Sequence, residues 1–218
     1  MFQIAHRGNS QEFGDNNLTS FQSALDNHFD MIELDVQLCK TGEIVIYHDI
    51  DINDTPIYVK DCTLSYLNNV GIITLNEFLD TISIDEIRFF FDVKGHEDVI
   101  YPLIEIIKSR FNDKQIERIY ISGFNRKFER ILVDSKLPIN IGFTTENTFE
   151  TDTLVYLCKN CNFVCLHWNA LDKDSITELH KKGTSVFSYT CKNNSIQEHM
   201  MNFDLDGIVT NYPLDLEF

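Results

Sequence analysis

The sequence MIELDVQ, at positions 31–37, has the length and the apolar content of a buried parallel β-strand. Successive residues of a strand point to opposite faces, so Glu33 and Asp35 share one face of it. Similar short apolar runs recur along the chain. They lie at positions 3–6, 88–93, 119–122, 140–143, 163–167, 184–189 and 207–210.

Segments with helical spacing of apolar residues separate these eight runs. In the third segment, for example, apolar residues recur at positions 100, 103, 104 and 107. Repeated strand–helix units joined by short turns predict a parallel sheet, and eight units suit closure into an α/β fold of the (β/α)8, or TIM, barrel type. An open doubly wound sheet is the alternative fold.

Two segments depart from this alternation. Residues 43–48 follow the turn at 40–42 too closely for a helix to intervene, so we expect a hairpin strand after the second barrel strand. Residues 49–73 form the longest irregular connection, which we expect to act as a short cap on the C-terminal face, where barrel enzymes recognise substrates. No stretch has the composition of a linker, so we expect a single domain over residues 1–218.

The charge balance limits the class of partner. The 218 residues carry 34 acidic and 18 basic side chains, a formal net charge of −16, which argues against nucleic acid as a partner. A small phosphate-bearing substrate stays compatible if a metal and local cations reverse the field within a pocket. The N-terminus does not resemble a signal peptide, and no run reaches the roughly 20 apolar residues of a transmembrane segment, so we expect a cytoplasmic protein.

Six cysteines are unevenly spread in a chain too large to need disulfide bonds, and we expect them to be reduced. The group Cys158, Cys161 and Cys165 suggests a zinc or redox site as an alternative, but no second close pair completes it. We expect these three to be ordinary core residues.

Three carboxylates are expected at the C-terminal ends of neighbouring strands. Glu33 and Asp35 share a face of the second strand, and Asp92 ends the apolar run RFFFDV at positions 88–93. Like charges buried side by side are costly unless a cation lies between them, and oxygen ligands suit a hard divalent ion. We therefore predict a metal site for Mg²⁺ or Ca²⁺. The alternatives are that one carboxylate pairs with a lysine or caps a helix, and that Lys94 simply neutralises Asp92.

Two histidines are expected close to this cluster. His6 ends the first strand and His48 ends the hairpin run, and imidazoles give and take protons near neutral pH. A lone histidine is more often structural, but two at strand ends beside three carboxylates favour an acid/base pair. His167 also ends a strand, without a partner that the sequence identifies.

Seven motifs occur in order from residue 4 to residue 213. They are HRG at 6–8, ELDV at 33–36, YHD at 47–49, DVK at 92–94, SGFN at 122–125, YT at 189–190 and DGIVTNYP at 206–213. Together they resemble the glycerophosphodiester phosphodiesterase family of the phospholipase C-like phosphodiesterase superfamily. Their order and spacing make the resemblance specific.

The resemblance implies a barrel enzyme, a phosphoric diester hydrolase that cleaves glycerophosphodiesters into glycerol phosphate and an alcohol with the help of a divalent cation. By position, it implies metal ligands at Glu33 and Asp35, a general acid/base pair at His6 and His48, phosphate contacts at Arg7 and Lys94, and a substrate contact at Tyr189. The nucleophile, a substrate hydroxyl or a water, stays open, as does which histidine is the acid.

Three features depart from the family pattern. The sequence GDNN at 14–17 stands where the family usually has Pro-Glu-Asn-Thr, so Asp15 replaces the expected glutamate. Asp92 stands where the third ligand is often glutamate, as in the sphingomyelinase D-like branch. The cap at 49–73 is shorter than usual.

Two other functions stay open at this point. One is phospholipase D-like head-group cleavage of a lysophospholipid or sphingolipid, which apolar residues at the rim would favour. The other is an inactive barrel that binds a phosphorylated ligand or a partner protein, which the lost Pro-Glu-Asn-Thr element suggests. The retained histidines and carboxylates argue against the inactive barrel.

Overall fold

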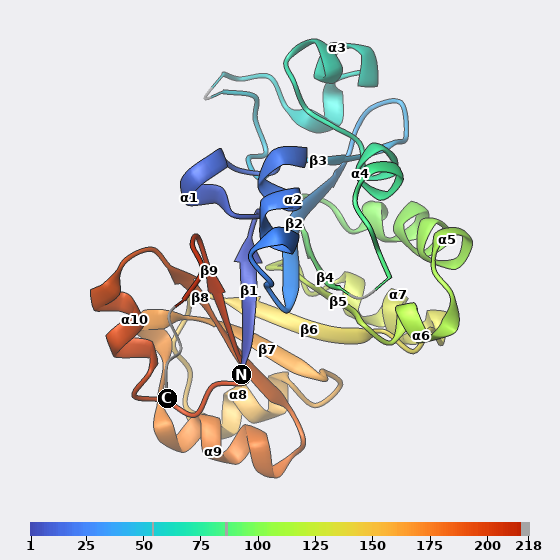
Figure 1. The fold of residues 1–218 in the computed structure, drawn as a ribbon. Coiled ribbons are helices and arrows are strands. Elements are labelled where there is room, and N and C mark those ends of the chain that lie inside the picture. Colours follow the sequence, from blue (N-terminus) through green and yellow to red (C-terminus); the bar gives the residue numbers. More distant parts are fainter. Residues whose placement is uncertain (54, 86, 215–218) are drawn as a thin grey trace.

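Eight parallel strands close into a barrel in the computed structural model, which describes residues 1–53, 55–85 and 87–214 (Figure 1). The strands are β1 (Phe2–His6), β2 (Met31–Leu38), β4 (Arg88–Val93), β5 (Ile119–Ser122), β6 (Asn140–Thr145), β7 (Phe163–His167), β8 (Ser185–Cys191) and β9 (Gly207–Thr210). Each strand pairs with the next in this order, and β9 pairs in parallel with β1 to close the ring. The predicted TIM barrel is confirmed, and the open sheet is wrong.

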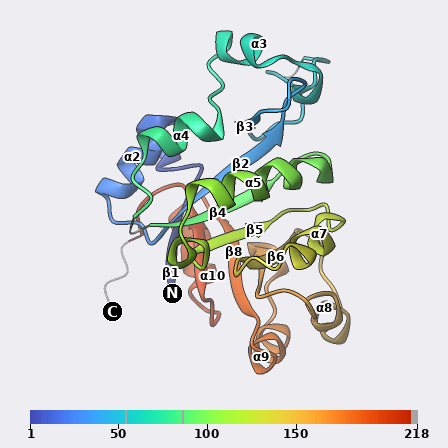
Figure 2. The same ribbon diagram turned by 90° about the vertical axis from the view of Figure 1, so that its right-hand side faces the viewer.

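Helices cover the outside of the barrel (Figure 2). The helices of the described chain are α1 (Ser10–Phe13), α2 (Leu18–Asp26), α3 (Leu64–Asn69), α4 (Leu75–Thr81), α5 (Ile100–Arg110), α6 (Asp113–Ile116), α7 (Phe128–Ser135), α8 (Thr151–Leu157), α9 (Lys173–Lys181) and α10 (Asn194–Met200), with 3-10 turns at η1 (Val59–Asp61), η2 (Glu97–Val99) and η3 (Trp168–Ala170). Of these, α3 and η1 lie away from the barrel wall, in segment 49–73 (Figure 2). Helix α5 buries Ile100, Leu103 and Ile107 on one face, as their helical spacing predicts. No helix in the described part of the chain is both long and apolar enough to cross a membrane.

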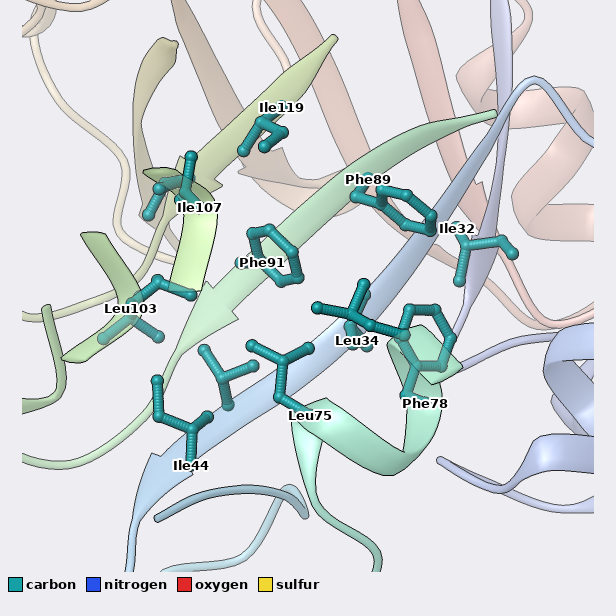
Figure 3. Packing of buried hydrophobic residues seen from close by; sticks show 14 of the residues in the cluster. Ile32, Leu34, Ile44, Leu75, Phe78, Phe89, Phe91, Leu103, Ile107 and Ile119 are labelled. Carbon is teal, nitrogen blue, oxygen red and sulfur yellow. The ribbon is translucent and has the colours of Figure 1, made fainter. Parts of the chain in front are cut away.

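The two faces of β2 and β4 meet different surroundings. Ile32 and Leu34 point outward and pack with Phe89 and Phe91 against α4 and α5 (Figure 3). The side chains that alternate with them, including Glu33, must point into the barrel. A shift of one residue in register would expose the apolar face to the interior and bury the acidic face against helices, so the outer core fixes where the carboxylates lie.

Aromatic rings fill the barrel interior below the carboxylates. Phe163 lies 5.4 Å from Phe90 and 5.0 Å from Phe187, measured between ring centroids. Gly142 makes room for this group, because a Cβ atom at that position would lie 2.3 Å from the ring of Phe163. The interior is therefore a packed layer that forms the floor of any site at the upper end of the barrel.

The hairpin and the cap form a small unit beyond the C-terminal ends of β1 and β2 (Figure 1). Strand β3 (Ile44–Ile46) pairs antiparallel with β2, which confirms the predicted hairpin. The segment 49–73 is less irregular than expected, since it contains η1 and α3. Its order comes from a separate apolar cluster that includes Cys39, Val45, Val59, Cys62 and Leu67, which no local periodicity predicts.

The cysteines do not gather into a metal site. Cys165 points into the barrel beside Phe163, whereas Cys158 packs into an outer cluster with Cys161 against it. Among the described residues, only the acidic group of β2 and β4 brings together three or more side chains suited to hold an ion.

We predict that Gly142→Ala destabilises the fold by about 1–3 kcal/mol, because the added methyl group overlaps the Phe163 ring in a packed interior. Urea unfolding measures the change. Phe163→Leu in the same chain should recover part of the loss, since leucine vacates the ring position. A double variant no more stable than Gly142→Ala alone would show that the contact is not the cause.

Candidate active site

A cavity of about 640 Å³ opens at the C-terminal ends of the barrel strands. The predicted site residues that line it are His6, Arg7, Glu33, His48, Asp92, Lys94 and Tyr189. Asp35 contacts this lining, because its Oδ1 lies 3.1 Å from Lys94 Nζ. The structure thus brings all eight predicted residues together, from β1, β2, β4, β8 and the loop after β3.

Glu33, Asp35 and Asp92 form one buried acidic group. One ligand atom from each lies within 4.8 Å of the others, and the three residues are 3%, 1% and 8% exposed. Burial and the charges of Asp35 and Asp92 raise the pKa of Glu33 well above its ordinary value. Burial also raises the pKa of Asp92, whereas at Asp35 the cations Lys94 and Arg7 outweigh burial and lower the pKa. With all three residues ionised, the group would carry three negative charges against the two positive charges of Lys94 and Arg7.

Two cations contact this group. Lys94 Nζ lies 2.6 Å from Asp92 Oδ2 and 3.1 Å from Asp35 Oδ1. Arg7 Nε lies 3.0 Å from Asp35 Oδ2, and the Arg7 backbone N–H donates to Glu33 Oε2 at 2.8 Å. Lys94 does form an ion pair with Asp92, as the alternative expected. Among the described residues, however, no cationic side chain forms a salt bridge with Glu33.

The sequence HRG at positions 6–8 produces this arrangement locally. Arg7 adopts a positive φ of 57°, which turns its N–H toward Glu33, and Gly8 follows with φ 84°. A Cβ atom on Gly8 would lie 2.5 Å from Ser20 Oγ. Glycine is therefore required for both conformation and space, because α2 passes directly against this turn.

The acidic group fits a divalent cation. Asp35 Oδ1 and Asp92 Oδ1 are buried and accept no hydrogen bond from the described residues. Three carboxylates, two of them with an oxygen that accepts no hydrogen bond from the described residues, are the kind of donor set that Mg²⁺ and Ca²⁺ prefer. The shorter side chain of Asp92 still reaches the group, so replacement of the family's glutamate does not break it.

The two histidines lie on the cavity wall with one ring nitrogen engaged. His6 Nδ1 lies 2.6 Å from Asn211 Oδ1, and His48 Nδ1 lies 2.7 Å from Asp49 Oδ1. Burial, together with the charge of Arg7, lowers the pKa of His6 to about 4. Both rings keep Nε2 available, which is what proton transfer to or from a bound group requires.

Tyr189 lies on β8, across the cavity from β2 and β4, the strands that carry the acidic group. Its ring meets His167 and Phe124 edge-on, and its hydroxyl is buried without a hydrogen-bond partner among the described residues. Burial raises the pKa of this hydroxyl, so it stays a neutral donor. An unsatisfied donor in a cavity is suited to a polar ligand.

The departure at positions 14–17 has a structural explanation. Asp15 Oδ2 lies 2.5 Å from Arg7 Nη1, Asn16 donates to Asp35 Oδ2 at 2.7 Å, and Asn17 caps α2 by accepting from Ser20 N–H. Asparagine is as good a cap as the threonine it replaces. Asp15 is half exposed and orients Arg7 at the rim, rather than joining the buried acidic group.

Sequence reasoning missed three asparagine and glutamine side chains that hold the site. These are Asn16, Gln37 and Asn211. Buried Gln37 donates through Nε2 to the carbonyls of Tyr47 and Asp49, both at 2.7 Å, and so fixes the loop on either side of His48. For Gln37 a signal existed, since it shares the inward period-two face of β2 with Glu33 and Asp35. Asn211 follows β9, which carries no predicted site residue.

Proteins of known sequence and structure are similar to this chain over nearly its whole length. Residues 6–215 match the model of the glycerophosphoryl diester phosphodiesterase family. A glycerophosphodiester phosphodiesterase of Caldanaerobacter subterraneus is 28% identical over 229 residues, 96% of this chain and 93% of that protein. The crystal structure of a glycerophosphodiester phosphodiesterase from Parabacteroides distasonis has a TM-score of 0.84 at 21% identity, covering 96% of this chain and 92% of that one. An Oleispira antarctica phosphodiesterase, solved in complex with the product sn-glycerol-3-phosphate, has a TM-score of 0.84 at 22% identity, covering 98% and 94%.

We predict that Glu33→Gln stabilises the metal-free protein at pH 8 by more than about 1 kcal/mol. Because the folded-state pKa of Glu33 is raised, its contribution to stability is full below the unfolded value and is lost as pH rises through the folded value. Glutamine avoids that loss. The melting temperatures of chelator-treated wild type and variant should therefore diverge from pH 5 to pH 8.

The wild type and Glu33→Gln should also differ in their response to metal. Mg²⁺ or Ca²⁺ should raise the melting temperature of the wild type and not that of Glu33→Gln, because binding to the folded state alone stabilises it. The exposed Glu105→Gln removes the same charge from α5 and is the control. Equal metal responses in Glu33→Gln and Glu105→Gln would mean that the ion binds elsewhere.

Proposed function

Because the chain belongs to the glycerophosphoryl diester phosphodiesterase family, and is therefore a phosphoric diester hydrolase, we propose that it cleaves glycerophosphodiesters to glycerol phosphate and an alcohol in the cavity at the top of the barrel. The observation that carries the proposal is the convergence of three carboxylates, two cations and two imidazoles on one cavity. The sn-glycerol-3-phosphate bound to the Oleispira antarctica relative supports glycerol phosphate as the product. Family membership argues against the inactive barrel.

Glu33, Asp35 and Asp92 would hold a divalent cation, which neutralises charge on the phosphoryl oxygens when it is bound. Arg7 and Lys94 lie on the same side of the cavity and add fixed positive charge where the transition state gains negative charge. Their ion pairs with Asp35 and Asp92 keep both side chains in place before the substrate arrives, so little reorganisation is needed.

The hydrogen bonds of the two histidines favour a division of roles. His6 Nδ1 donates to the side-chain amide oxygen Oδ1 of Asn211. The lone pair on His6 Nε2 is then left to accept the proton of the attacking hydroxyl. His48 is 40% exposed and sits on the loop side of the cavity, where the leaving alkoxide can take a proton and depart to solvent. Asp49 holds the His48 ring in that orientation.

Head-group cleavage of a lysophospholipid is the second candidate. Phe124, Trp168 and Ile196 give the cavity an apolar rim, the feature expected of an enzyme that admits an acyl chain. A comparison of glycerophosphocholine with lysophosphatidylcholine separates the two candidates. Turnover of the lipid alone would overturn the preferred substrate class.

We predict that His6→Ala and His48→Ala each lower kcat on glycerophosphocholine by about 10²–10⁴-fold, the usual contribution of a general acid or base. Neither residue belongs to the acidic group, so both variants should keep the metal-dependent rise in melting temperature. His28→Asn, an exposed histidine with positive φ that asparagine tolerates, is the control. Wild-type turnover in either alanine variant would rule out the assigned role.

We predict that Gln37→Met lowers kcat by about 10-fold or more, because the loop that carries His48 loses both hydrogen bonds that the Gln37 side chain donates to it. Gln37 acts through His48, so the substitution should cost little more in a His48→Ala background. A double-mutant cycle measures this coupling. Fully additive losses would contradict a positioning role.

A further inference from the structure

Two further hollows, together called the groove, adjoin the active-site cavity on the side of the cap. The main cavity shares His48, Lys94 and Phe124 with a neighbouring hollow of about 440 Å³. That hollow shares Ile50, Lys94 and Gly95 with a third of about 460 Å³. These shared residues place both hollows beside the reacting centre, so a group attached to glycerol phosphate has space on the side of the cap.

Two lysines line the far end of this groove. Lys40 lies in the β2–β3 turn and Lys60 in η1, and both are exposed. The Lys40 N–H donates to the Cys62 carbonyl at 2.9 Å, which ties the two segments together. Their neighbours Cys39 and Val59 are buried in the cap's own cluster, so the backbone beneath both lysines is fixed.

The far end of the groove carries positive charge from both lysines. Neither Lys40 nor Lys60 forms a salt bridge with any described residue, although the protein carries 34 acidic against 18 basic side chains. Lys60 Nζ instead lies over the Tyr58 ring, 6.0 Å from its centroid. Asp98 is the acidic residue that lines this hollow, and it pairs with His96 at 2.9 Å.

We propose that Lys40 and Lys60 form a subsite for a second anionic group on the alcohol portion of the substrate, so that the enzyme prefers glycerophosphodiesters whose alcohol is itself phosphorylated. The inference rests on the proposed function and adds the class of alcohol. In a protein of net charge −16, which repels anions over much of its surface, two unpaired lysines in a hollow beside the substrate cavity give a local attraction for an anionic group. A choline group would gain nothing from them.

The test compares glycerophosphoinositol with glycerophosphoinositol 4-phosphate, which differ by one phosphate on the alcohol. The full chain with Mg²⁺ should show a kcat/KM about tenfold higher for the phosphorylated substrate, through a lower KM. Lys40→Gln and Lys60→Gln should each reduce this preference about threefold and the double variant should abolish it, because each lysine contributes as an exposed ion pair does. The preference should also shrink as salt rises.

Lys182→Gln is the matched control, since this exposed lysine caps the C-terminal end of α9. Its kcat/KM ratio should equal that of the wild type, and all variants should melt at the wild-type temperature. Equal kcat/KM for the two substrates in the wild type, or a preference that persists in the double variant, overturns the subsite while glycerophosphoinositol is still cleaved. Failure to cleave any glycerophosphodiester would instead refute the proposed function, and the subsite with it.

Discussion

Three buried carboxylates, with ligand atoms within 4.8 Å of one another, determine the electrostatics of the upper end of this barrel. Their mutual repulsion and loss of solvent raise the pKa of Glu33 and Asp92, and Lys94 and Arg7 offset only part of the cost. The arrangement is stable because a large apolar core outside β2 and β4 holds both strands in one register. Stability supplied by the outer core thus maintains an unfavourable charge cluster where a cation and a phosphate can bind.

Every second residue of a barrel strand points inward, so the eight strands together form a ring of inward-facing side chains. Positions on the inner face carry aromatic rings at mid-height, such as Phe90 and Phe163, and polar groups at the strand ends. Eight strands deliver these ends to one cavity, so residues more than 200 positions apart, such as His6 and Asn211, come within 2.6 Å. The packed rings below exclude water from the floor, which strengthens the electrostatic interactions above them.

The cap adds residues to this site through a packing cluster of its own. Its apolar cluster is independent of the barrel core and fixes a loop that carries His48 on one side and the two groove lysines on the other. Under the proposed subsite, a small change in the cap would alter the alcohol that is accepted without moving the acidic group. The barrel carries the acidic group, the cap positions His48 and the groove lysines, and Lys94 lines the cavity and both hollows between them.

The sequence alone determined the eight strands, the inward faces of β2 and β4 and the position of His6 at a strand end, because these follow from local periodicity and from turns of a few residues. The predicted strand end at His48 is wrong by two residues, since β3 ends at Ile46 and His48 lies in the loop that follows. The sequence also supported the family, since ordered motifs are a property of the chain. Only the tertiary structure decided that Asn211 holds His6, that Asn16 contacts Asp35, and that Gln37 supports the loop of His48. These contacts, like the order within the cap, depend on closure of the barrel and on packing between segments distant in sequence, which no local pattern encodes.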